Sequence, residues 1–293
     1  MIPYAYELFS KFHSEVNRQR KRIVIMGDAM TDRWVHGHRE KSQDGCEKFI
    51  QEEVVVVPGG AANAQRCLSA WDVRTSCYSY PPNDCPIKTR YVENGKIIFR
   101  VDEDGTPVRG RGYQWARDLS VEMLASADAV LLSDYDKGFL SPEFIKSVAQ
   151  ICLQKRIPCV ADCKREPGIY NGCIRKCNTD YQHKYNDDLA RRVFDAPPGL
   201  GAHLVVTAGE GNPIVWDGDG PIGLGYDLAR INCVNHVGAG DCFAAHLTLA
   251  LACGLSLKES AAIAHSAGRM YVQHIHNFPP SIAGIANDMA NAT

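Results

Sequence analysis

The chain has 293 residues, enough for one large domain or two small ones with a core that needs no disulfide or metal. Its 45% hydrophobic and 23% charged residues exclude a disordered, collagen-like or coiled-coil chain. The 32 Lys and Arg residues nearly balance the 34 Asp and Glu residues, and the net charge is -2. Because no overall positive field attracts a polyanion, we expect no nucleic-acid partner.

The longest apolar runs, such as residues 54–57, are far shorter than the ~20 residues that cross a bilayer, so no membrane segment is expected. Residues 1–7 lack the basic region, apolar stretch and cleavage site of a secretory signal. A cytoplasmic location is therefore expected. The 12 cysteines are scattered along the chain, below the density of a disulfide scaffold, and we interpret them as mostly reduced core thiols.

Residues 4–20 place apolar side chains at helical spacing among charged ones, which predicts an amphipathic helix. Its apolar positions are Tyr4, Leu8, Phe9, Phe12 and Val16. We interpret residues 1–20 as an N-terminal helical arm that packs on the domain or on a second subunit. Residues 21–293 then form one large domain.

Residues 22–28 are an apolar run that ends in Gly-Asp, typical of a strand buried on both faces of a parallel sheet. Residues 129–134, 157–162 and 203–209 have the same character, and helical patterns separate several of these runs. The sequence therefore predicts an α/β fold, with a mostly parallel central sheet and helices on both faces. Such sheets bind ligands at the carboxyl ends of their strands.

Two stretches break this alternation and resemble antiparallel ribbon. They are residues 35–57 and residues 88–102, the second with an Asn94-Gly95 turn between β-prone residues. We assign segments of about 33–57 and 86–104 to a small β-lid over the edge of the sheet.

The strongest local motif is Val-Gly-Ala-Gly-Asp at residues 237–241, followed by an apolar helical pattern that ends at Cys253-Gly254. Gly238 and Gly240 let backbone amides approach a ligand, and the start of a helix favours an anion such as a phosphoryl group. Asp241 can then accept a proton from a substrate hydroxyl. The alternative is an ordinary glycine turn before a helix.

A second glycine pair opens another helix at residues 58–63, Pro-Gly-Gly-Ala-Ala-Asn. Asn63 can exchange hydrogen bonds with a polyol, although a tight strand-to-helix turn explains the same residues. Asp28 and Asp32 follow the first strand, where a carboxylate either binds neighbouring sugar hydroxyls or caps a helix.

Together these motifs resemble the ribokinase-like (PfkB) carbohydrate kinases, over about residues 22–280. Within that family, residues 28–33, 98–102, 132–138 and 161–164 are most similar to the kinases of heptose 7-phosphate. The resemblance implies ATP and Mg²⁺ as cofactors, a sugar or sugar phosphate as substrate, and a homodimer through the lid as one available assembly.

The resemblance also implies roles for individual residues. Asp241 is the base, and Gly238, Ala239 and Gly240 form the anion hole. Substrate binding falls to Asp28, Asp32, Gly59, Gly60, Asn63, Lys88, Arg90, Arg100, Asp102 and Lys137. Nucleotide binding falls to Asp162, Lys164, Asn178, Thr207, Gly209, Gly211, Asn235, His265 and Gly268. The Lys and Arg residues suit a phosphate already on the substrate, or are solvated charges on a ribbon.

Two departures from the family pattern affect the phosphates. Asn235, His236 and Val237 stand where the family usually has Asp-Thr before its Gly-Ala-Gly-Asp motif. Tyr181 stands where the Asn-x-x-Glu motif supplies the glutamate that organises magnesium. Loss of metal-organising carboxylates affects both binding and transfer, so a protein that binds these ligands with little turnover is an open alternative.

We therefore expect an ATP-dependent sugar or sugar phosphate kinase, with heptose 7-phosphate favoured. The alternatives are a kinase-like sensor or partner protein that binds sugar phosphate or nucleotide, and a nucleoside kinase on the same fold. The sugar, the hydroxyl, the phosphoryl donor and the oligomeric state stay open.

Three further patterns are interpreted as structural. The Gly-x-Gly-x-x-Gly spelling at residues 218–223 contains a proline and is expected to be a loop. The Cys-x₃-Cys-x₉-Cys-x₃-Cys series could bind zinc, but buried thiols are favoured. It comprises Cys159, Cys163, Cys173 and Cys177. The His-x-His pairs at residues 36–38 and 274–276 are expected to be surface histidines.

Overall fold

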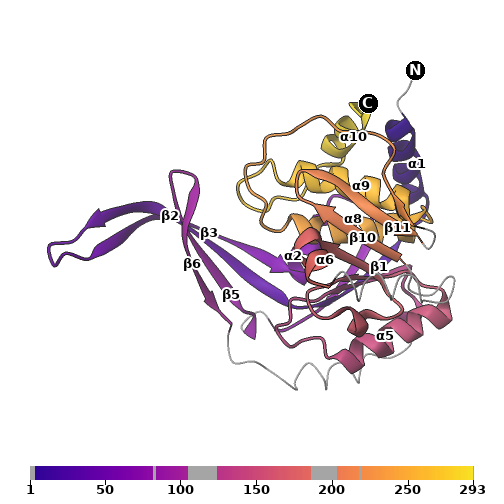
Figure 1. The fold of residues 1–293 in the computed structure, drawn as a ribbon, viewed down its shortest axis with the longest axis horizontal. Helices are drawn as coiled ribbons and strands as arrows, with labels where there is room; N and C mark the ends of the chain where they lie inside the picture. The colour runs from indigo at the N-terminus through magenta and orange to yellow at the C-terminus, as the bar shows by residue number, and fades with distance from the viewer. Residues whose placement is uncertain (1–3, 82–83, 105–123, 186–202, 218–219, 293) are drawn as a thin grey trace.

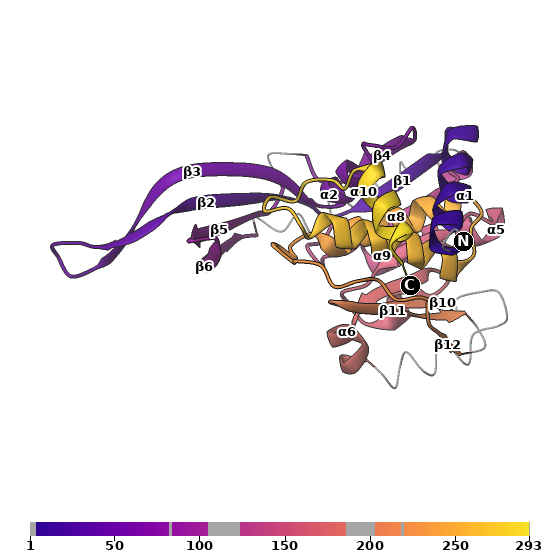
Figure 2. The same cartoon turned by 90° about the horizontal axis from the view of Figure 1, so that it is seen from above.

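The computed structural model describes residues 4–81, 84–104, 124–185, 203–217 and 220–292. It has an α/β body and a β-sheet lid that projects from one end of the body (Figure 1). Seen from above, the ribbon of β2 and β3 extends well beyond the helices (Figure 2). The lid assigned from the sequence is therefore confirmed as a separate sheet.

The strands are β1 (Arg22–Gly27), β2 (Ala29–Lys41), β3 (Glu47–Gly60), β4 (Arg74–Tyr78), β5 (Ile87–Glu93), β6 (Lys96–Glu103), β7 (Ala129–Ser133), β8 (Cys159–Asp162), β9 (Ile174–Asn178), β10 (His203–Ala208), β11 (Gly211–Asp217) and β12 (Pro221–Ile222). The helices are α1 (Tyr4–Arg18), α2 (Ala61–Cys67), α5 (Pro142–Lys155), α6 (Thr179–Lys184), α8 (Ala239–Ala252), α9 (Leu257–Tyr271) and α10 (Ile282–Ala290), with a 3-10 turn η2 (Pro167–Tyr170).

The central sheet has the order β12-β11-β10-β9-β8-β7-β1-β4. Its strands from β10 to β4 pair in parallel, and β11 and β12 add an antiparallel edge. The predicted α/β fold and its four strands are confirmed. The apolar pattern does not predict β9, because Arg175 and Lys176 interrupt it, yet both side chains are buried.

Helices cover both faces of this sheet because alternate side chains of each strand point to opposite sides. Ile23 and Ile25 of β1 join one core cluster with α1, α2, α8, α9 and α10. Val24 and Met26 join the other cluster, on the side of α5. Parallel strands buried on both faces explain why these runs are continuously apolar.

The predicted N-terminal helix is present as α1. Its apolar face is buried in the body, where Phe12 packs edge-on against Trp71 with ring centroids 4.9 Å apart. The N- and C-terminal helices α1 and α10 also lie side by side (Figure 1). The division of the chain at residue 20 stays a prediction.

The lid is a four-stranded sheet with the order β3-β2-β5-β6. Its two hairpins are antiparallel and meet through a parallel pairing of β2 with β5. Asn94 and Gly95 both have positive φ, 50° and 74°, as the predicted two-residue turn requires. The hairpin of β2 and β3 is longer than predicted, since it begins at Ala29 and ends at Gly60.

One smaller expectation is corrected, at the edge of the central sheet. Pro221 and Ile222, inside the expected loop at residues 218–223, form the short edge strand β12, while residues 218 and 219 lie outside the described residues. A proline is tolerated at such a sheet edge. Within the described ranges, no helix has the length and apolar character needed to cross a membrane.

Candidate active site

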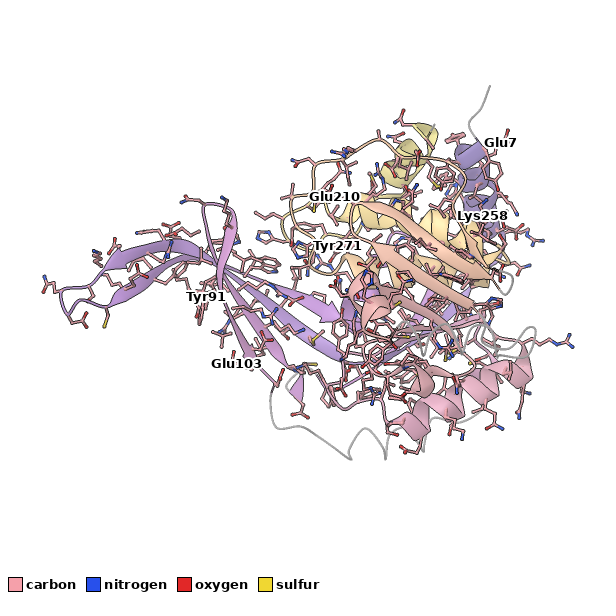
Figure 3. The ribbon with its side chains drawn as sticks, in the orientation of Figure 1. Glu7, Tyr91, Glu103, Glu210, Lys258 and Tyr271 are labelled. Atoms are coloured by element: carbon pink, nitrogen blue, oxygen red, sulfur yellow. The ribbon has the colours of Figure 1, made fainter. Side chains whose placement is uncertain are left out.

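The two glycine motifs converge at the carboxyl end of the central sheet. Gly238 precedes α8 with φ of 83°, and a Cβ atom there would lie 2.4 Å from Tyr271 Oη and 2.7 Å from Asn63 Nδ2. Only glycine fits this position. Figure 3 labels Tyr271 in the body, and the lid with Tyr91 and Glu103 extends away from it. At the start of α8 the Ala239 N–H donates to His236 O at 3.2 Å, whereas the N–H groups of Gly240 and Asp241 have no backbone acceptor among the described residues and can face a ligand.

Asp241 lies in the first turn of α8 and is only 2% exposed. Its Oδ2 atom accepts a hydrogen bond of 3.0 Å from Asn63 Nδ2 of α2, and its Oδ1 atom accepts one of 2.6 Å from Tyr135 Oη. The helices opened by the two glycine motifs thus meet through Asn63 and Asp241. Each carboxylate oxygen retains a second lone pair for another donor.

Burial raises the pKa of Asp241 to about 6, although the hydrogen bonds from Tyr135 and Asn63 act to lower it. The nearby Asp162 raises the pKa further and the Lys164 ammonium lowers it. A carboxylate with a pKa close to neutral pH is ionised under ordinary conditions and still accepts a proton readily. These are the properties of a general base.

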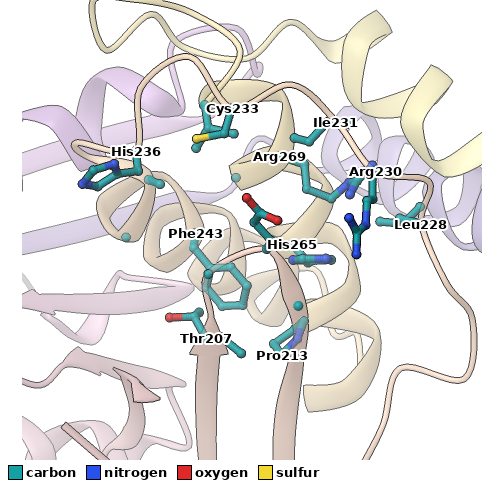
Figure 4. A pocket seen from close by; sticks show the side chains of 18 residues that line it. Thr207, Pro213, Leu228, Arg230, Ile231, Cys233, His236, Phe243, His265 and Arg269 are labelled. Atoms are coloured by element: carbon teal, nitrogen blue, oxygen red, sulfur yellow. The ribbon is translucent and has the colours of Figure 1, made fainter. Parts of the chain in front are cut away.

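A cavity of about 390 Å³ lies beside the start of α8 (Figure 4). We call it the β10–α8 cavity. Five of the predicted nucleotide residues line it: Thr207, Gly209, Gly211, His265 and Gly268. Ala239 and Gly240 of the predicted anion hole line it as well. The residue after Gly240 is Asp241, whose carboxylate is covered by Tyr135 and Asn63 and does not line the cavity.

Sequence reasoning missed several residues of this cavity. Phe243 lies about one helical turn after Gly240 on α8, and its ring lines the cavity (Figure 4). The apolar pattern of this helix does not distinguish Phe243 from its other apolar residues. His265 is neutral, since burial and the neighbouring Arg269 lower its pKa to about 4. Arg269 itself pairs with Asp288 at 3.0 Å, so its charge is already matched within the protein.

The lid brings Asp32 to the body. Its Oδ1 atom accepts from Arg90 Nη1 at 2.5 Å, and its Oδ2 atom accepts from Asn277 Nδ2 at 3.3 Å. Both Asp32 and Arg90 are buried, and Arg90 also lies 5.1 Å from the Trp34 ring. A Cβ atom at Gly59 would lie 2.6 Å from Asp32 Oδ2, so a glycine is needed here to leave room for this oxygen.

Asp28 has a structural role, in place of the predicted contact with sugar. Its carboxylate is fully buried and accepts hydrogen bonds from the backbone N–H groups of Tyr135, Lys137 and Phe139, at 2.8, 3.1 and 3.1 Å. Burial nevertheless raises its pKa. Asp28 therefore holds the loop that carries Tyr135, which in turn donates to Asp241. Gly60 is fixed by a backbone bond too, because the N–H that follows it donates to Asp28 O at 3.0 Å.

The predicted cations do not act as one group. Arg100 pairs with Asp102 at 2.8 Å, and Lys137 pairs with Asp104 at 2.7 Å. Arg90 is paired too, with Asp32. Whether these cations bind a substrate phosphate or are charges on a ribbon stays a prediction. Lys88 differs, because among the described residues it has no ion-pair partner within 4.0 Å and its Nζ atom lies 5.1 Å from the Tyr135 ring. Burial lowers its pKa.

Asp162 and Lys164 lie on the other side of Tyr135, at the end of β8. Lys164 Nζ is 3.3 Å from Asp162 Oδ1 and 5.3 Å from the Tyr135 ring. Lys176 of β9, which sequence reasoning missed, also contacts Asp162 Oδ1, at 3.1 Å. A charged residue inside a strand gives no sequence signal for burial, and only the pairing of β8 with β9 brings Lys176 opposite Asp162.

Asn178 and Asn235 are used within the protein. Asn178 caps α6, where its Oδ1 atom accepts from the Tyr181 backbone at 2.9 Å. Asn235 Nδ2 donates to Ile275 O at 2.9 Å, and its Oδ1 atom accepts from Val237 N. Neither side chain lines the β10–α8 cavity, whereas His236, the residue after Asn235, does. The predicted nucleotide contacts of these two asparagines are therefore not supported.

The cysteine series and the histidine pairs form contacts within the protein. Cys159 and Cys173 lie with their Sγ atoms 3.6 Å apart in the core, and burial raises the pKa of Cys163. The part of the chain that the structure describes contains no group of three or more metal-ligating side chains. His36 and His276 are not separate surface residues as expected, since their Nε2 atoms are 2.8 Å apart and join the lid to the body.

Comparison with known proteins gives matches in sequence and in structure. Residues 181–277 match the model of the pfkB family carbohydrate kinases. The chain is 27% identical over 294 residues to the bifunctional protein HldE of Caulobacter vibrioides, which covers 86% of this chain. It is 24% identical over 310 residues to the HldE protein of Geobacter metallireducens, with 91% covered. The chain spans about 60% of the length of these curated relatives.

Solved structures of low identity share the fold. Phosphofructokinase-2 from Escherichia coli superimposes with a TM-score of 0.69 at 16% identity, covering 93% of this chain and 99% of the other. Arabidopsis thaliana ribokinase, complexed with ribose and ATP, gives a TM-score of 0.63 at 15% identity, covering 92% and 99%. These likenesses show a ribokinase-like fold, and the match of residues 181–277 shows similarity to the pfkB family carbohydrate kinases over that part of the chain.

Proposed function

We propose that this protein transfers the γ-phosphoryl group of ATP to a hydroxyl of a sugar or sugar phosphate. The observation that carries the proposal is the placement of Asp241, a buried carboxylate with a pKa of about 6 in the turn that follows the Gly238–Gly240 amides. The PfkB match and the ribokinase-like fold support the same reaction class.

The reaction follows from this arrangement. The substrate hydroxyl donates its proton to Asp241, and its oxygen attacks the γ-phosphorus as the bond to the β–γ bridging oxygen breaks. ADP then leaves. The amides at the start of α8 stabilise the negative charge of the transferring group. Tyr135 moves from Oδ1 of Asp241, or shares it, when the hydroxyl binds, because it covers that oxygen in the free protein.

The donor side of Asp241 is the β10–α8 cavity together with Asp162, Lys164 and Lys176. A volume of about 390 Å³ is within the usual range for small-molecule sites. The neutral imidazole of His265 and the ring of Phe243 offer an apolar wall for the nucleotide base. The phosphates then extend toward Gly240 at the other end of the cavity.

The acceptor side of Asp241 is the lid face that carries Asp32, Lys88 and Arg90, together with Asn63. Lys88 is the cation best suited to a phosphate on the substrate, because the other predicted lid cations are already paired. The early motifs that resemble heptose 7-phosphate kinases, and the HldE relatives, support a heptose 7-phosphate-like substrate.

A second candidate function is binding of the same ligands with little turnover. It is favoured by the loss of the metal-organising glutamate, whose place Tyr181 takes with its hydroxyl bonded to Arg165 O at 2.6 Å. The hydrogen bond from Tyr135 Oη to Asp241 Oδ1, which occupies part of the carboxylate, also favours this second function.

One experiment separates these functions. The purified protein is incubated with ATP and Mg²⁺ and a panel containing heptose 7-phosphate, hexose phosphates, free sugars and nucleosides, and ADP release is measured beside calorimetric binding. We expect transfer to a sugar phosphate and weaker transfer to the free sugar. Binding without transfer to any member would favour the sensor, and preferred transfer to nucleosides would favour a nucleoside kinase.

The lid also offers a surface for a second copy of this chain, which we propose as the partner. Its exposed face carries Val54, Val56 and Phe99, of which Phe99 is 61% exposed. Val54 and Val56 lie on one edge strand of the lid, β3, and Phe99 lies on the other, β6. Exposed apolar side chains are a common basis for association. Sedimentation analysis measures whether the protein is dimeric.

A further inference from the structure

We propose that Asn277 is a positioning residue for the acceptor side of the site. Its side chain holds the Asp32 carboxylate of the lid in a fixed position relative to the turn that leads into α8. The inference rests on the proposed function, because it concerns the sugar or sugar phosphate that Asp32 would bind. No motif in the sequence singles out Asn277.

Asn277 is a buried amide in the segment between α9 and α10. Its backbone φ is 38°, within the left-handed region that asparagine adopts more readily than most residues with a Cβ atom. The residue is 0% exposed, so bulk water does not reach its side chain. Because a buried polar group without partners costs free energy, the hydrogen bonds that Asn277 makes indicate its role.

One of these hydrogen bonds goes to Asp32, whose carboxylate is held from two directions. Arg90 of the lid donates to Oδ1 at 2.5 Å, and Asn277 of the body donates to Oδ2 at 3.3 Å. Each carboxylate oxygen retains a second lone pair for a sugar hydroxyl. The bond from Asn277 thus ties a carboxylate of the lid directly to the body.

A second amide continues this link to the turn that leads into α8. Asn235 Nδ2 donates to Ile275 O at 2.9 Å and to Asn277 Oδ1 at 3.4 Å. The Oδ1 atom of Asn235 accepts from Val237 N at 3.0 Å. The contacts that start at Asp32 therefore reach the residue just before the glycine motif of α8.

Apolar packing reinforces the same junction. Val237 packs against a small lid cluster, which consists of Trp34, Val57 and Val92. Asn235 and Val237 are two of the residues at which this chain departs from the family pattern, and both belong to the junction of lid and body. A hydroxyl held by Asp32 and a phosphoryl group at the start of α8 are thereby kept at a set distance, which direct transfer requires.

The test is calorimetric titration of the full chain with each sugar phosphate of the transfer panel, and separately with ATP. Asn277→Gly keeps the positive φ and removes the amide, so Kd for the sugar phosphate that binds most tightly should rise roughly tenfold. Kd for ATP alone should change by less than about twofold, because Asn277 does not line the β10–α8 cavity.

Asn94→Gly is the matched control. Asn94 is also an asparagine with positive φ, 50°, but it is exposed at the turn of the lid. The backbone effect of the substitution is therefore the same, whereas no contact with Asp32 is lost. Both Kd values should stay as in the wild type.

Asn277→Asp adds a result that a merely structural role would not produce. A protonated carboxyl at this position donates to Asp32, whereas an ionised one repels it, so Kd for the sugar phosphate should be near the wild-type value at about pH 5.5 and above that of Asn277→Gly at about pH 8.5. The wild type is measured at each pH, because other charged or titratable groups lie near this position in both proteins. They are Lys88, Arg90, His36 and His276.

Circular dichroism checks the folding of each variant, and if Asn277→Gly unfolds, the pH dependence of Asn277→Asp decides the question. An unchanged Kd for the sugar phosphate in Asn277→Gly, equal weakening of sugar phosphate and ATP, or no sugar phosphate binding by the wild type would overturn the inference. Transfer by a wild type whose Asn277→Gly variant binds normally would leave the proposed function intact. Sugar phosphate binding that depends on Asn277, without transfer, would do the reverse.

Discussion

The two sides of Asp241 balance their charges differently. On the acceptor side, buried Asp32 pairs with Arg90, and the more exposed Arg100 and Lys137 pair with Asp102 and Asp104. Of these four predicted cations, Lys88 is the one without an ion-pair partner among the described residues. On the donor side, two ammonium groups share the single carboxylate of Asp162. The acceptor side is therefore held by one-to-one ion pairs, whereas on the donor side two ammonium groups share Asp162 and one of them, Lys164, also interacts electrostatically with Asp241.

The largest effect is expected on turnover, for a substitution of Asp241, which lies between the two sides. Asp241→Asn removes the base but keeps a side chain of the same shape, so turnover should fall ~10²–10⁴-fold. Binding of ATP and sugar phosphate should change by less than about threefold, because the asparagine keeps the shape of the side chain and the Asp162–Lys164 and Asp32–Arg90 pairs stay in place. Initial rates and calorimetry on the same preparation measure both. An unchanged kcat would remove Asp241 from the mechanism.

The same variant has a predicted effect on stability. The pKa of Asp241 is raised from 3.8 to about 6 in the folded protein, so its ionised form opposes folding. This cost is absent below pH 3.8, grows as the pH rises through 6 and is complete above it. Asp241→Asn should therefore be more stable than the wild type at pH 7.5, by roughly 1–3 kcal/mol in urea unfolding. Equal stability at pH 7.5 would contradict the raised pKa.

A large structural effect is expected on the acceptor side. Asp32→Asn leaves the Arg90 guanidinium buried without a carboxylate, which typically costs about 3–5 kcal/mol. Glu15→Gln is the control, since it breaks only the exposed Glu15–Arg18 pair of α1 and should cost under about 1 kcal/mol. Urea unfolding compares the two. A similar small loss for both would show that the acceptor side is not held by this pair.

A smaller effect is expected at Lys88. Lys88→Met keeps the apolar stem and removes the ammonium, so KM for a sugar phosphate should rise by roughly tenfold while KM for the free sugar stays unchanged. Lys137→Met is the control, because Lys137 is paired with Asp104 and should change either KM by less than about twofold. If the two variants had equal effects, Lys88 would not be the specific phosphate-binding cation of the acceptor side.

The smallest effect is expected at Tyr135. The hydroxyl of Tyr135 lowers the pKa of Asp241, so Tyr135→Phe should raise that pKa and move the acidic limb of the pH profile of kcat/KM to higher pH. The rate at high pH should change little. A shift of the limb to lower pH would mean that another group titrates in the profile.

Much of this architecture was predictable from local patterns. Apolar runs ending in polar residues predicted β1, β7, β8 and β10, and Asn94-Gly95 predicted the lid turn. The family resemblance, and not the local pattern, assigned the two glycine motifs to one site.

The rest depends on pairings between distant segments. A carboxylate that follows a strand has the same sequence pattern whether it binds sugar or, as Asp28 does, three backbone N–H groups. Lys176 lies in a strand interrupted by charge, and its burial follows only from the register that places it opposite Asp162. The ion pairs of the lid likewise follow from strand order, which alternation alone does not fix.

The most direct test of the central claim is a crystal structure with a non-hydrolysable ATP analogue and the sugar phosphate that the assay selects. We expect the acceptor hydroxyl within ~3 Å of the Asp241 carboxylate, Tyr135 displaced or sharing that oxygen, and the γ-phosphate at the Gly238–Gly240 amides. A sugar bound out of reach of Asp241, or phosphates directed away from Gly240, would contradict the account.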